Sequence, residues 1–379
     1  MARGRSFAVA LSALSLVVAA VTAPDDPTVV VAAETFGVPA AAAEADADTA
    51  TRIEEATGID AAAEAGEAVA SVAAPPSSPA TTSTTEPPRG RLVINAVGDV
   101  NVDPGYIPAL VTEGYDHALS GMGGLFLEDD LTIINLECPA SDRGAIVPKQ
   151  FNFRCDVAAL PSLRRLGVDV ANQGNNHILD YGVEAMLDSL VQLEAAGIAP
   201  VGAGENAAAA HEPAVFSIDG WTVAVVGFGG VVPGASWIAT DDRPGMADGD
   251  TIETMVAAVR AADEVADVVA VTIHWGVELQ SGPPADDVRR AEAMIDAGAD
   301  MIFGHHPHRL NALEFIDGKP VSWSLGNFVW PRLSAAGSDT AVAQVIVEPD
   351  GGITACYLDA TIVSNGHPQL DDPTTRSCV

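Results

Sequence analysis

Residues 174–182, GNNHILDYG, show best how this chain is organised. They follow an apolar run, 168–171, that predicts a buried strand. After them, apolar residues recur at the spacing of a helix: Val183, Met186, Leu187, Leu190 and Val191. Asn176 and His177 are therefore expected in the tight turn between a strand and a helix. In open α/β sheets, ligands bind at the carboxyl ends of the strands, so this turn is a candidate site.

Four other short motifs also follow apolar, strand-like runs. They are GDVN at 98–101, NLE at 135–137, HWG at 274–276 and GHHPH at 304–308. Helical patterns separate the early strands, whereas hairpin signals appear around Asp219–Gly220 and 349–352. This mixture indicates an α/β or α+β sandwich rather than a barrel. We expect the five turns to meet at one edge and hold metal.

Charge and length limit the classes of partner. The chain has 379 residues, with 52 acidic and 18 basic side chains and a formal net charge of -34. Nucleic acid is not an expected partner, because binding to phosphate backbones requires a basic surface. An anionic substrate would be repelled in bulk, so it would need local cations at its site.

The N-terminal part predicts export. Arg3 and Arg5 precede an apolar run, 7–23, so residues 1–23 are expected to be a signal peptide or an N-terminal anchor. Either one places the domain on the extracellular face of the membrane or secretes it. Residues 24–90, rich in Ala, Glu, Pro and Thr, are expected to form a disordered linker. The folded domain is expected at 91–365, followed by a C-terminal tail at 366–379.

Four cysteines in an exported chain favour disulfides over free buried thiols. Four cysteines allow three pairings, and the sequence does not choose among them. The nearest neighbours, Cys138 with Cys155 and Cys356 with Cys378, are the pairs that we expect.

The motif ends carry the residue types of a metal site. On an extended segment His306 and His308 would point to one side, whereas His305 would point away. Imidazoles bind zinc, iron and manganese, and a buried carboxylate is costly unless it is paired or bound to a cation. The alternatives are a surface loop for the histidines, a core role for His274 and turn roles for the others. The candidate ligands are Asp99, Glu137, Asn176, His274, His306 and His308.

Six mixed oxygen and nitrogen ligands suit two divalent ions that share a carboxylate. Mn, Fe, Zn and Mg are all compatible with them. His177 lies beside a ligand and is expected to act as the catalytic residue, protonating a leaving group or stabilising charge on the substrate. Asp180 would either hold the His177 imidazole in one tautomer or cap the helix after Gly182.

The motifs GDV, NLE, NNHILDYG, HWG, GHHPH and SLGNF occur in the order seen in the CapA family of bacterial capsule-synthesis proteins, which is associated with poly-γ-glutamate. The resemblance covers about residues 92–347. That family looks like a branch of the calcineurin-like metallophosphoesterases, so the resemblance implies a four-layer αββα sandwich. It also implies a division of the ligands between two ions that share Glu137: Asp99 and His308 for one, and Asn176, His274 and His306 for the other.

Two departures bear on activity. Asn101 stands where the wider superfamily usually has His, and Glu137 stands where the bridging residue is usually Asp. Both put phosphatase activity in doubt more than the fold. Asn101, Lys149, Arg154, Arg309 and Asn327 are candidate substrate contacts, against the alternatives of surface charge and turn roles. Trp275, Trp323 and Trp330 would wall the site or pack in the core.

Three functions are compatible with these features. The first is an exported CapA-like protein that serves poly-γ-glutamate or capsule synthesis or export through a dinuclear, hydrolase-type metal site. The second is a secreted phosphoesterase acting on nucleotides or phosphodiesters. The third is a non-enzymatic subunit of a membrane capsule-synthesis complex.

Overall fold

The structure is a computed structural model that describes residues 88–364, 366–372 and 375–379. The expected signal peptide or anchor, 1–23, and the expected linker up to residue 87 lie outside the described residues. Within the described ranges, no helix has the length and apolar character needed to cross a membrane. The description that follows concerns the compact unit Ala80–Val379.

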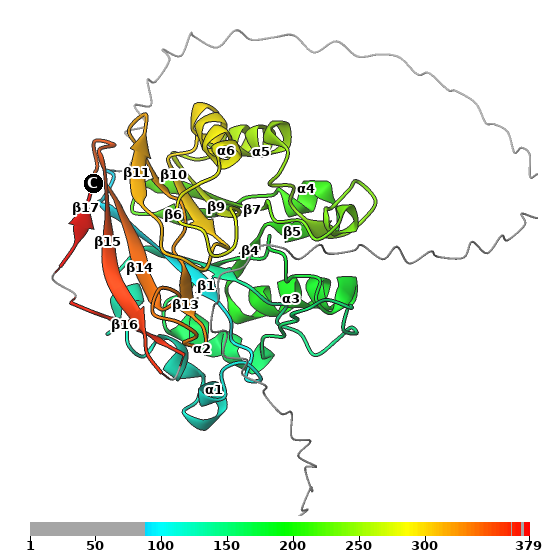
Figure 1. Cartoon of the computed structure of the whole chain (residues 1–379). Helices are drawn as coiled ribbons and strands as arrows, with labels where there is room; N and C mark the ends of the chain where they lie inside the picture. Colours follow the sequence, from blue (N-terminus) through cyan, green and yellow to red (C-terminus); the bar gives the residue numbers. More distant parts are fainter. Residues whose placement is uncertain (1–87, 365, 373–374) are drawn as a thin grey trace, which may run out of the picture. The chain divides into compact units, whose positions relative to one another are not determined.

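Two sheets form the centre of this unit (Figure 1). The strands of the larger sheet are β1 Leu92–Val100, β2 Leu131–Leu136, β3 Val170–Asn172, β4 Ala199–Val201, β13 Asn327–Val329, β14 Asp339–Val347, β15 Ile353–Ile362, β16 Pro368–Leu370 and β17 Ser377–Cys378. The strands of the smaller sheet are β6 Ala214–Ile218, β7 Trp221–Gly229, β9 Val268–His274, β10 Met301–His305, β11 Leu313–Ile316 and β12 Lys319–Ser322. A separate pair consists of β5 Ala203–Gly204 and β8 Gly245–Met246.

The order of strands follows from the alternation of strands and helices. The larger sheet runs β16-β15-β14-β1-β2-β3-β4, with β13 beside β1 and β17 beside β15. The smaller sheet runs β11-β12-β10-β9-β7-β6. β1 to β4 are parallel, and so are β7, β9, β10 and β12. The parallel strands therefore bring their carboxyl ends to one edge of each sheet. The C-terminal stretch 366–379 contributes β16 and β17, which pair with β15.

The two sheets pack face to face through an apolar core. Alternate residues of β1 and β2, such as Ile94 and Ile133, meet Val225 of β7 and Phe303 of β10. Period-two alternation places such side chains on one face of each strand. Burial of each large apolar side chain stabilises the fold by about 1.5–3 kcal/mol.

Helices cover the two outer faces (Figure 1). They are α1 Ala109–Thr112, α2 Leu160–Arg165, α3 Gly182–Ala196, α4 Ala207–Ala210, α5 Ile252–Asp263 and α6 Ala285–Asp296. Leu163 of α2 and Leu193 of α3 pack on the larger sheet. Met255 of α5 and Met294 of α6 pack on the smaller sheet. The expected four-layer αββα arrangement is confirmed.

A close approach of chain segments fixes the end of β1. The pairing of β1 with β2 shifts in register between Ala96 and Asp99. Gly98 lies in this shift, and a Cβ atom there would stand 2.2 Å from the carbonyl oxygen of Gly326. Only glycine fits such an approach. As a result, Asp99 lies beside Asn327 of β13.

Candidate metal centre

The candidate site lies where β1, β2 and β3 of the larger sheet and β9 and β10 of the smaller sheet end. The structure brings all six expected ligands to this edge: Asp99, Glu137, Asn176, His274, His306 and His308. Asp99, Glu137 and His274 are fully buried. Parallel strands bring these residues together although they are far apart in the chain.

Two groups have the geometry of metal ligands. One consists of Glu137, His274 and His306, and the other of Asp99, Glu137 and His308. Within each group the ligand atoms lie within 4.8 Å of one another, and Glu137 is common to both. The Oδ1 atom of Asn176 lies 2.9 Å from Nε2 of His274.

The turn after β10 adopts an unusual backbone. His306 and His308 have φ angles of 93° and 53°, in the left-handed region that non-glycine residues rarely occupy. An extended backbone was expected for His306 and His308, and that prediction is wrong. Their rings are nevertheless neighbours, with centroids 5.8 Å apart. Such strain persists where the surrounding structure imposes it, which is common at functional sites.

His305 belongs to the neighbourhood of the site but points differently. Its Nε2 atom lies 3.0 Å from the Thr272 hydroxyl, within the smaller sheet. Its Nδ1 atom still lies 3.9 Å from Asp99 Oδ1. Burial lowers the pKa of His305 to about 4, so it is neutral at pH 7.

Burial and mutual charge shift the ionisation of the ligands. Burial and the charge of Asp99 raise the pKa of Glu137 well above its usual value. Burial also raises the pKa of Asp99, but the hydrogen bond from His308 and the charges of the surrounding histidines together outweigh this and leave the pKa below its usual value. Burial lowers the pKa of His308, but Glu137 and Asp99 raise it to about 9. Burial and the nearby His308 lower the pKa of His306 to about 4. His308 thus carries the positive charge that faces the Asp99 carboxylate, 3.0 Å away.

Unpaired polar atoms show that these side chains fit a cation. In the described part of the chain, neither oxygen of Glu137 has a hydrogen-bond partner, and Nδ1 of His306 has none. The nearest imidazole nitrogen to Glu137 Oε1 is Nε2 of His274, at 3.6 Å. Such a buried carboxylate is costly without a counter-charge. Buried carboxylates and neutral imidazoles are the donors that divalent first-row ions and zinc take. The cluster is therefore consistent with a metal site.

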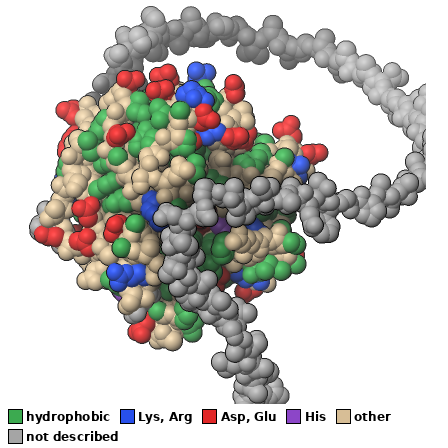
Figure 2. All heavy atoms as spheres, in the orientation of Figure 1, with side chains coloured by type: hydrophobic (Ala, Val, Ile, Leu, Met, Phe, Trp, Pro, Cys, Tyr) green, Lys and Arg blue, Asp and Glu red, His purple; other side chains and the backbone are tan. Residues whose placement is uncertain are grey.

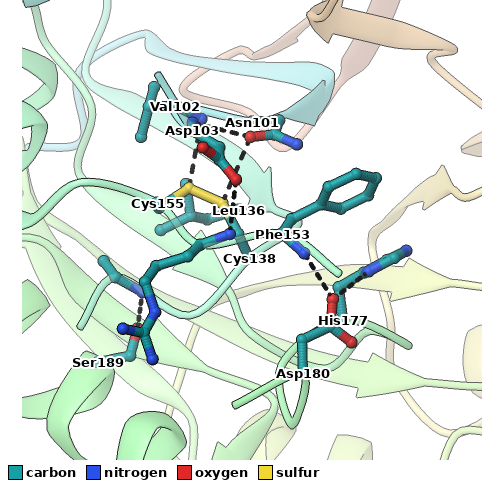
Figure 3. Close-up of a disulfide and its surroundings, with 12 residues drawn as sticks. Asn101, Val102, Asp103, Leu136, Cys138, Phe153, Cys155, His177, Asp180 and Ser189 are labelled. Carbon is teal, nitrogen blue, oxygen red and sulfur yellow. Dashed lines mark hydrogen bonds and ion pairs between the residues drawn. A yellow bond between two sulfur atoms is a disulfide. The ribbon is translucent and has the colours of Figure 1, made fainter. Parts of the chain in front are cut away.

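His177 stands beside the candidate ligand Glu137, and Figure 3 shows its ring next to the Asp180 carboxylate. Its Nδ1 atom lies 2.6 Å from Asp180 Oδ2. The Asp180 carboxylate also accepts from the Phe153 amide at 2.8 Å and from Lys149 Nζ at 2.7 Å. Helix α3 begins after Tyr181 and has no side-chain cap, so Asp180 holds His177 rather than capping the helix. We assign the Nδ1 proton to the bond with Asp180, which leaves Nε2 facing Glu137 at 3.9 Å.

The expected substrate contacts take different positions. Lys149 reaches the site and contacts the Asn176 carbonyl oxygen and His177. Asn327 Oδ1 lies 2.8 Å from Nδ1 of His308, and Arg309 donates to the His308 carbonyl oxygen. Both therefore support a ligand in this structure.

Two other expected contacts are engaged elsewhere. The Arg154 guanidinium lies 3.6 Å above the Tyr181 ring, and Asn101 Oδ1 accepts from the Asp103 amide. The side chains of Arg154 and Asn101 thus have contacts within the fold.

Two aromatic rings lie next to the site, of which only Trp330 was expected from the sequence, whereas Phe153 was missed. Phe153 stacks on His177 with ring centroids 4.2 Å apart, and Trp330 lies 5.0 Å from His308. Of the three expected tryptophans, Trp275 and Trp323 stack on each other within the core instead. Trp330 alone walls the site.

Asn135 was also missed, although it belongs to the NLE motif that was singled out. Its Nδ2 atom donates to Asp99 Oδ1 at 2.9 Å and lies 3.2 Å from Nδ1 of His274. One amide thus orients a ligand from each sheet. Such orienting contacts tune metal affinity.

The cysteines pair in the structure as Cys138–Cys155 and Cys356–Cys378. The first bridge lies next to the site (Figure 3) and closes the loop that carries Lys149 and Phe153. Closing a loop of this length contributes about 3 kcal/mol in the chain-entropy account. The bridge therefore restrains the loop that holds Asp180 and His177.

Comparisons with known proteins identify relatives. Residues 93–332 match the family model described as bacterial capsule synthesis protein PGA_cap. The PGA biosynthesis protein CapA of Bacillus subtilis (strain 168) is 32% identical over 260 residues, covering 67% of this chain and 67% of the relative. The capsule biosynthesis protein CapA of Bacillus anthracis is 29% identical over 269 residues, covering 69% and 65%. A probable polyglutamine synthesis accessory protein of Mycobacterium tuberculosis (strain ATCC 25618 / H37Rv) is 33% identical over 211 residues, covering 53% and 55%. The chain thus spans about two thirds of the length of the Bacillus relatives and about half of the mycobacterial one.

Solved structures give more distant matches. The NAD nucleotidase NadN of Haemophilus influenzae aligns with a TM-score of 0.43 at 13% identity, covering 74% of this chain and 54% of that one. The Thermus thermophilus sulfate thiohydrolase SoxB aligns with a TM-score of 0.42 at 15% identity, covering 70% and 56%.

Proposed function

This chain belongs to the PGA_cap family of bacterial capsule synthesis proteins, and from that premise we propose that it acts on poly-γ-glutamate or a similar anionic envelope polymer through a dinuclear metal centre. The Bacillus subtilis relative is named for PGA biosynthesis and the Bacillus anthracis relative for capsule biosynthesis. The observation that carries the proposal is the buried Glu137 carboxylate, which is common to two ligand groups and lacks hydrogen-bond partners among the described residues.

Each ligand group would hold one divalent ion. One ion would be held by Asp99, Glu137 and His308, and the other by Glu137, His274, His306 and the Asn176 amide oxygen. Two such ions, when bound, polarise a substrate oxygen and lower the pKa of water. Mn, Fe, Zn and Mg all remain candidates for these sites.

The protein's own contribution is to place a proton. Asp180 holds Nδ1 of His177, so that Nε2 faces the Glu137 side of the site. Stacking on Phe153 fixes the plane of the ring. Burial lowers the pKa of His177, so Nε2 of the neutral ring accepts the proton of the attacking nucleophile. The imidazolium formed in this way, held by Asp180, then donates that proton to the leaving group when a bond in the polymer is cleaved or transferred.

The proposal includes export and a membrane-associated setting. It is supported by the basic-then-apolar pattern of residues 1–23 and by the two disulfide bridges, which persist in oxidising compartments. Anionic polymer is the proposed substrate, and a capsule-synthesis complex at the membrane is the proposed partner.

A secreted phosphoesterase is the second candidate. The observation in its favour is the pair of carboxylate–imidazole groups sharing one acid, an arrangement that also suits phosphoester displacement. A non-enzymatic polymer-binding subunit is the third. The His177–Asp180 pair argues against it, because neither residue belongs to a ligand group and a structural metal would need no such pair.

Metal analysis combined with two substrates separates the three candidates. The purified chain is expected to carry divalent metal by mass spectrometry and to shorten poly-γ-glutamate, with the shortening abolished in His177→Ala. Hydrolysis of bis-p-nitrophenyl phosphate alone would support the phosphoesterase. Metal and polymer binding without turnover on either substrate would support the subunit. A folded chain without divalent metal would refute the first two.

A further inference from the structure

Nearly all of the basic side chains that the structure describes form ion pairs or hydrogen bonds within the protein. Of 18 basic residues, Arg3, Arg5 and Arg52 lie outside the described residues. Nine others form ion pairs with carboxylates: Arg89, Arg91, Arg143, Lys149, Arg164, Arg165, Arg289, Arg290 and Lys319. Four more donate to carbonyl or amide oxygens: Arg154, Arg243, Arg309 and Arg376. Within the described ranges, only Arg260 and Arg332 have no partner of either kind.

These two arginines lie in different surroundings. Arg260 is exposed on the surface of α5. Arg332 is also exposed but lines a cavity of about 330 Å³ together with Tyr106, Ile107, Pro331 and Gly366. Acidic and basic side chains are scattered over the molecular face seen in Figure 2. Among the basic residues that the structure describes, Arg332 is therefore unusual in having an unpaired guanidinium that lines a cavity.

Aromatic rings connect this cavity to the metal centre. Tyr106 packs edge-on against Phe153 with ring centroids 4.6 Å apart, and Phe153 stacks on His177 at 4.2 Å. On the other side, Trp330 contacts both His308 and Phe153 and is followed directly by Pro331 of the cavity wall. The cavity is thus separated from His177 by two ring contacts.

The length of a γ-linked glutamate unit can be compared with these two ring contacts, whose centroid distances of 4.6 and 4.2 Å set an upper limit on the separation of the Tyr106 and His177 rings. A γ-linked unit has two more backbone bonds than an α-linked residue and spans roughly 6 Å when extended. One to two units therefore cover the path from His177 to Tyr106. Each unit carries two methylene groups, which suit an aromatic wall, and one carboxylate, which suits a guanidinium.

We propose that the cavity between Tyr106 and Arg332 is a subsite that binds a carboxylate-bearing unit of an anionic polymer, one to two repeats from the metal centre. The Arg332 guanidinium receives the carboxylate, and the Tyr106 ring covers the methylene groups. The Asp103 carboxylate accepts the backbone amides of Gly105 and Arg154 and keeps its negative charge near Tyr106, so the Arg332 guanidinium has to outweigh its repulsion. The subsite rests on the proposed function for its substrate class.

Binding rather than turnover tests the subsite. The full chain is titrated by calorimetry with γ-linked pentaglutamate and, separately, with neutral γ-linked pentaglutamine. Arg332→Gln is expected to weaken pentaglutamate binding about three- to tenfold, because one charge-assisted contact is lost. The matched control is Arg260→Gln, which removes the same charge from an exposed arginine with no described partner and should change affinity by less than about twofold. Tyr106→Ala should weaken binding as well.

The outcomes distinguish this subsite from the proposed function. Equal effects of Arg332→Gln and Arg260→Gln would overturn the subsite, because the loss would then reflect only the overall field. Equal affinity for pentaglutamine, or no binding of pentaglutamate to the wild-type chain, would also overturn it. Selective weakening by Arg332→Gln in a chain that carries no metal and cleaves no polymer would support the subsite and refute the proposed function.

Discussion

The two sheets contribute different chemistry to the same site. The larger sheet supplies oxygen donors, from Asp99, Glu137 and Asn176, whereas the smaller sheet supplies imidazoles, from His274, His306 and His308. Neither sheet alone provides a complete ligand group, because each group contains residues from both. The site therefore depends on how the two sheets pack together, and bound metal would join their edges.

Substitution of Glu137 tests whether the two sheets share one site, because Glu137 is the oxygen donor common to both ligand groups. Glu137→Gln keeps the shape of the side chain but removes its charge. We expect metal content to fall to less than half and polymer cleavage to fall at least about a thousandfold, because both ions lose a ligand. Metal content by mass spectrometry and turnover by polymer length measure these effects.

The control for this variant is Glu128→Gln. Glu128 is exposed and lies outside both ligand groups. The Glu128→Gln variant should keep full metal content and activity. If Glu137→Gln also kept both while remaining folded, the sharing of one acid between the sheets would be refuted.

His177 is an exception to the rule that the smaller sheet supplies the imidazoles. It is an imidazole carried by the larger sheet, on the turn after β3, and it belongs to neither ligand group. His177→Ala should therefore keep the metal content and lower kcat about 10²- to 10⁴-fold, as expected for loss of a general acid. Asp180→Asn should give a smaller loss, because the imidazole that carries the proton remains although its contacts with Asp180 are weakened. A fall in bound metal for His177→Ala would instead make it a ligand.

Asn135 joins the two halves of the site without being a ligand. Its amide contacts Asp99 from the larger sheet and His274 from the smaller one. Asn135→Ala should lower metal affinity about ten- to a hundredfold, as for other contacts that orient ligands. Competition with a fluorescent chelator measures the affinity. Asn152→Ala is the control, because Asn152 donates only to the backbone carbonyls of Val147 and Asp180. Equal affinities in the two variants would remove Asn135 from the site.

The comparison also shows what sequence patterns can and cannot predict. The turns after β1, β2, β3, β9 and β10 were predictable because apolar runs end in polar motifs there, and parallel strands carry such ends to one edge. The left-handed backbone at His306 and His308 was not, because it depends on surrounding packing. The contacts of Phe153, Asn135 and Arg332 depend on chain segments that meet only in the folded state. The periodicity and spacing of residues in the sequence do not predict such contacts between distant segments.

Asp129 lies just before β2, at the opposite end of that strand from Glu137. The two acids therefore allow the two ends of one strand to be compared. Asp129 accepts hydrogen bonds from Asn95 and Thr132, and it belongs to no ligand group. Burial raises its pKa to about 6 although these bonds lower it. In the unfolded chain the pKa is about 3.9, so the folded state takes up the proton first as pH falls.

Proton uptake by Asp129 therefore adds stability as pH falls from about 7 to about 4, and the added stability is lost as pH rises through about 6. Asp129→Asn removes this titration, because its neutral amide is not penalised by burial at high pH. The variant should be more stable than the wild type at pH 7.5 by a small margin, and the margin should shrink at pH 5. Urea unfolding of both proteins at the two pH values measures it. Parallel pH dependences would mean that Asp129 stays ionised in the folded protein, and that solvent or neighbours stabilise its charge at this end of the sheet as a metal would at the other.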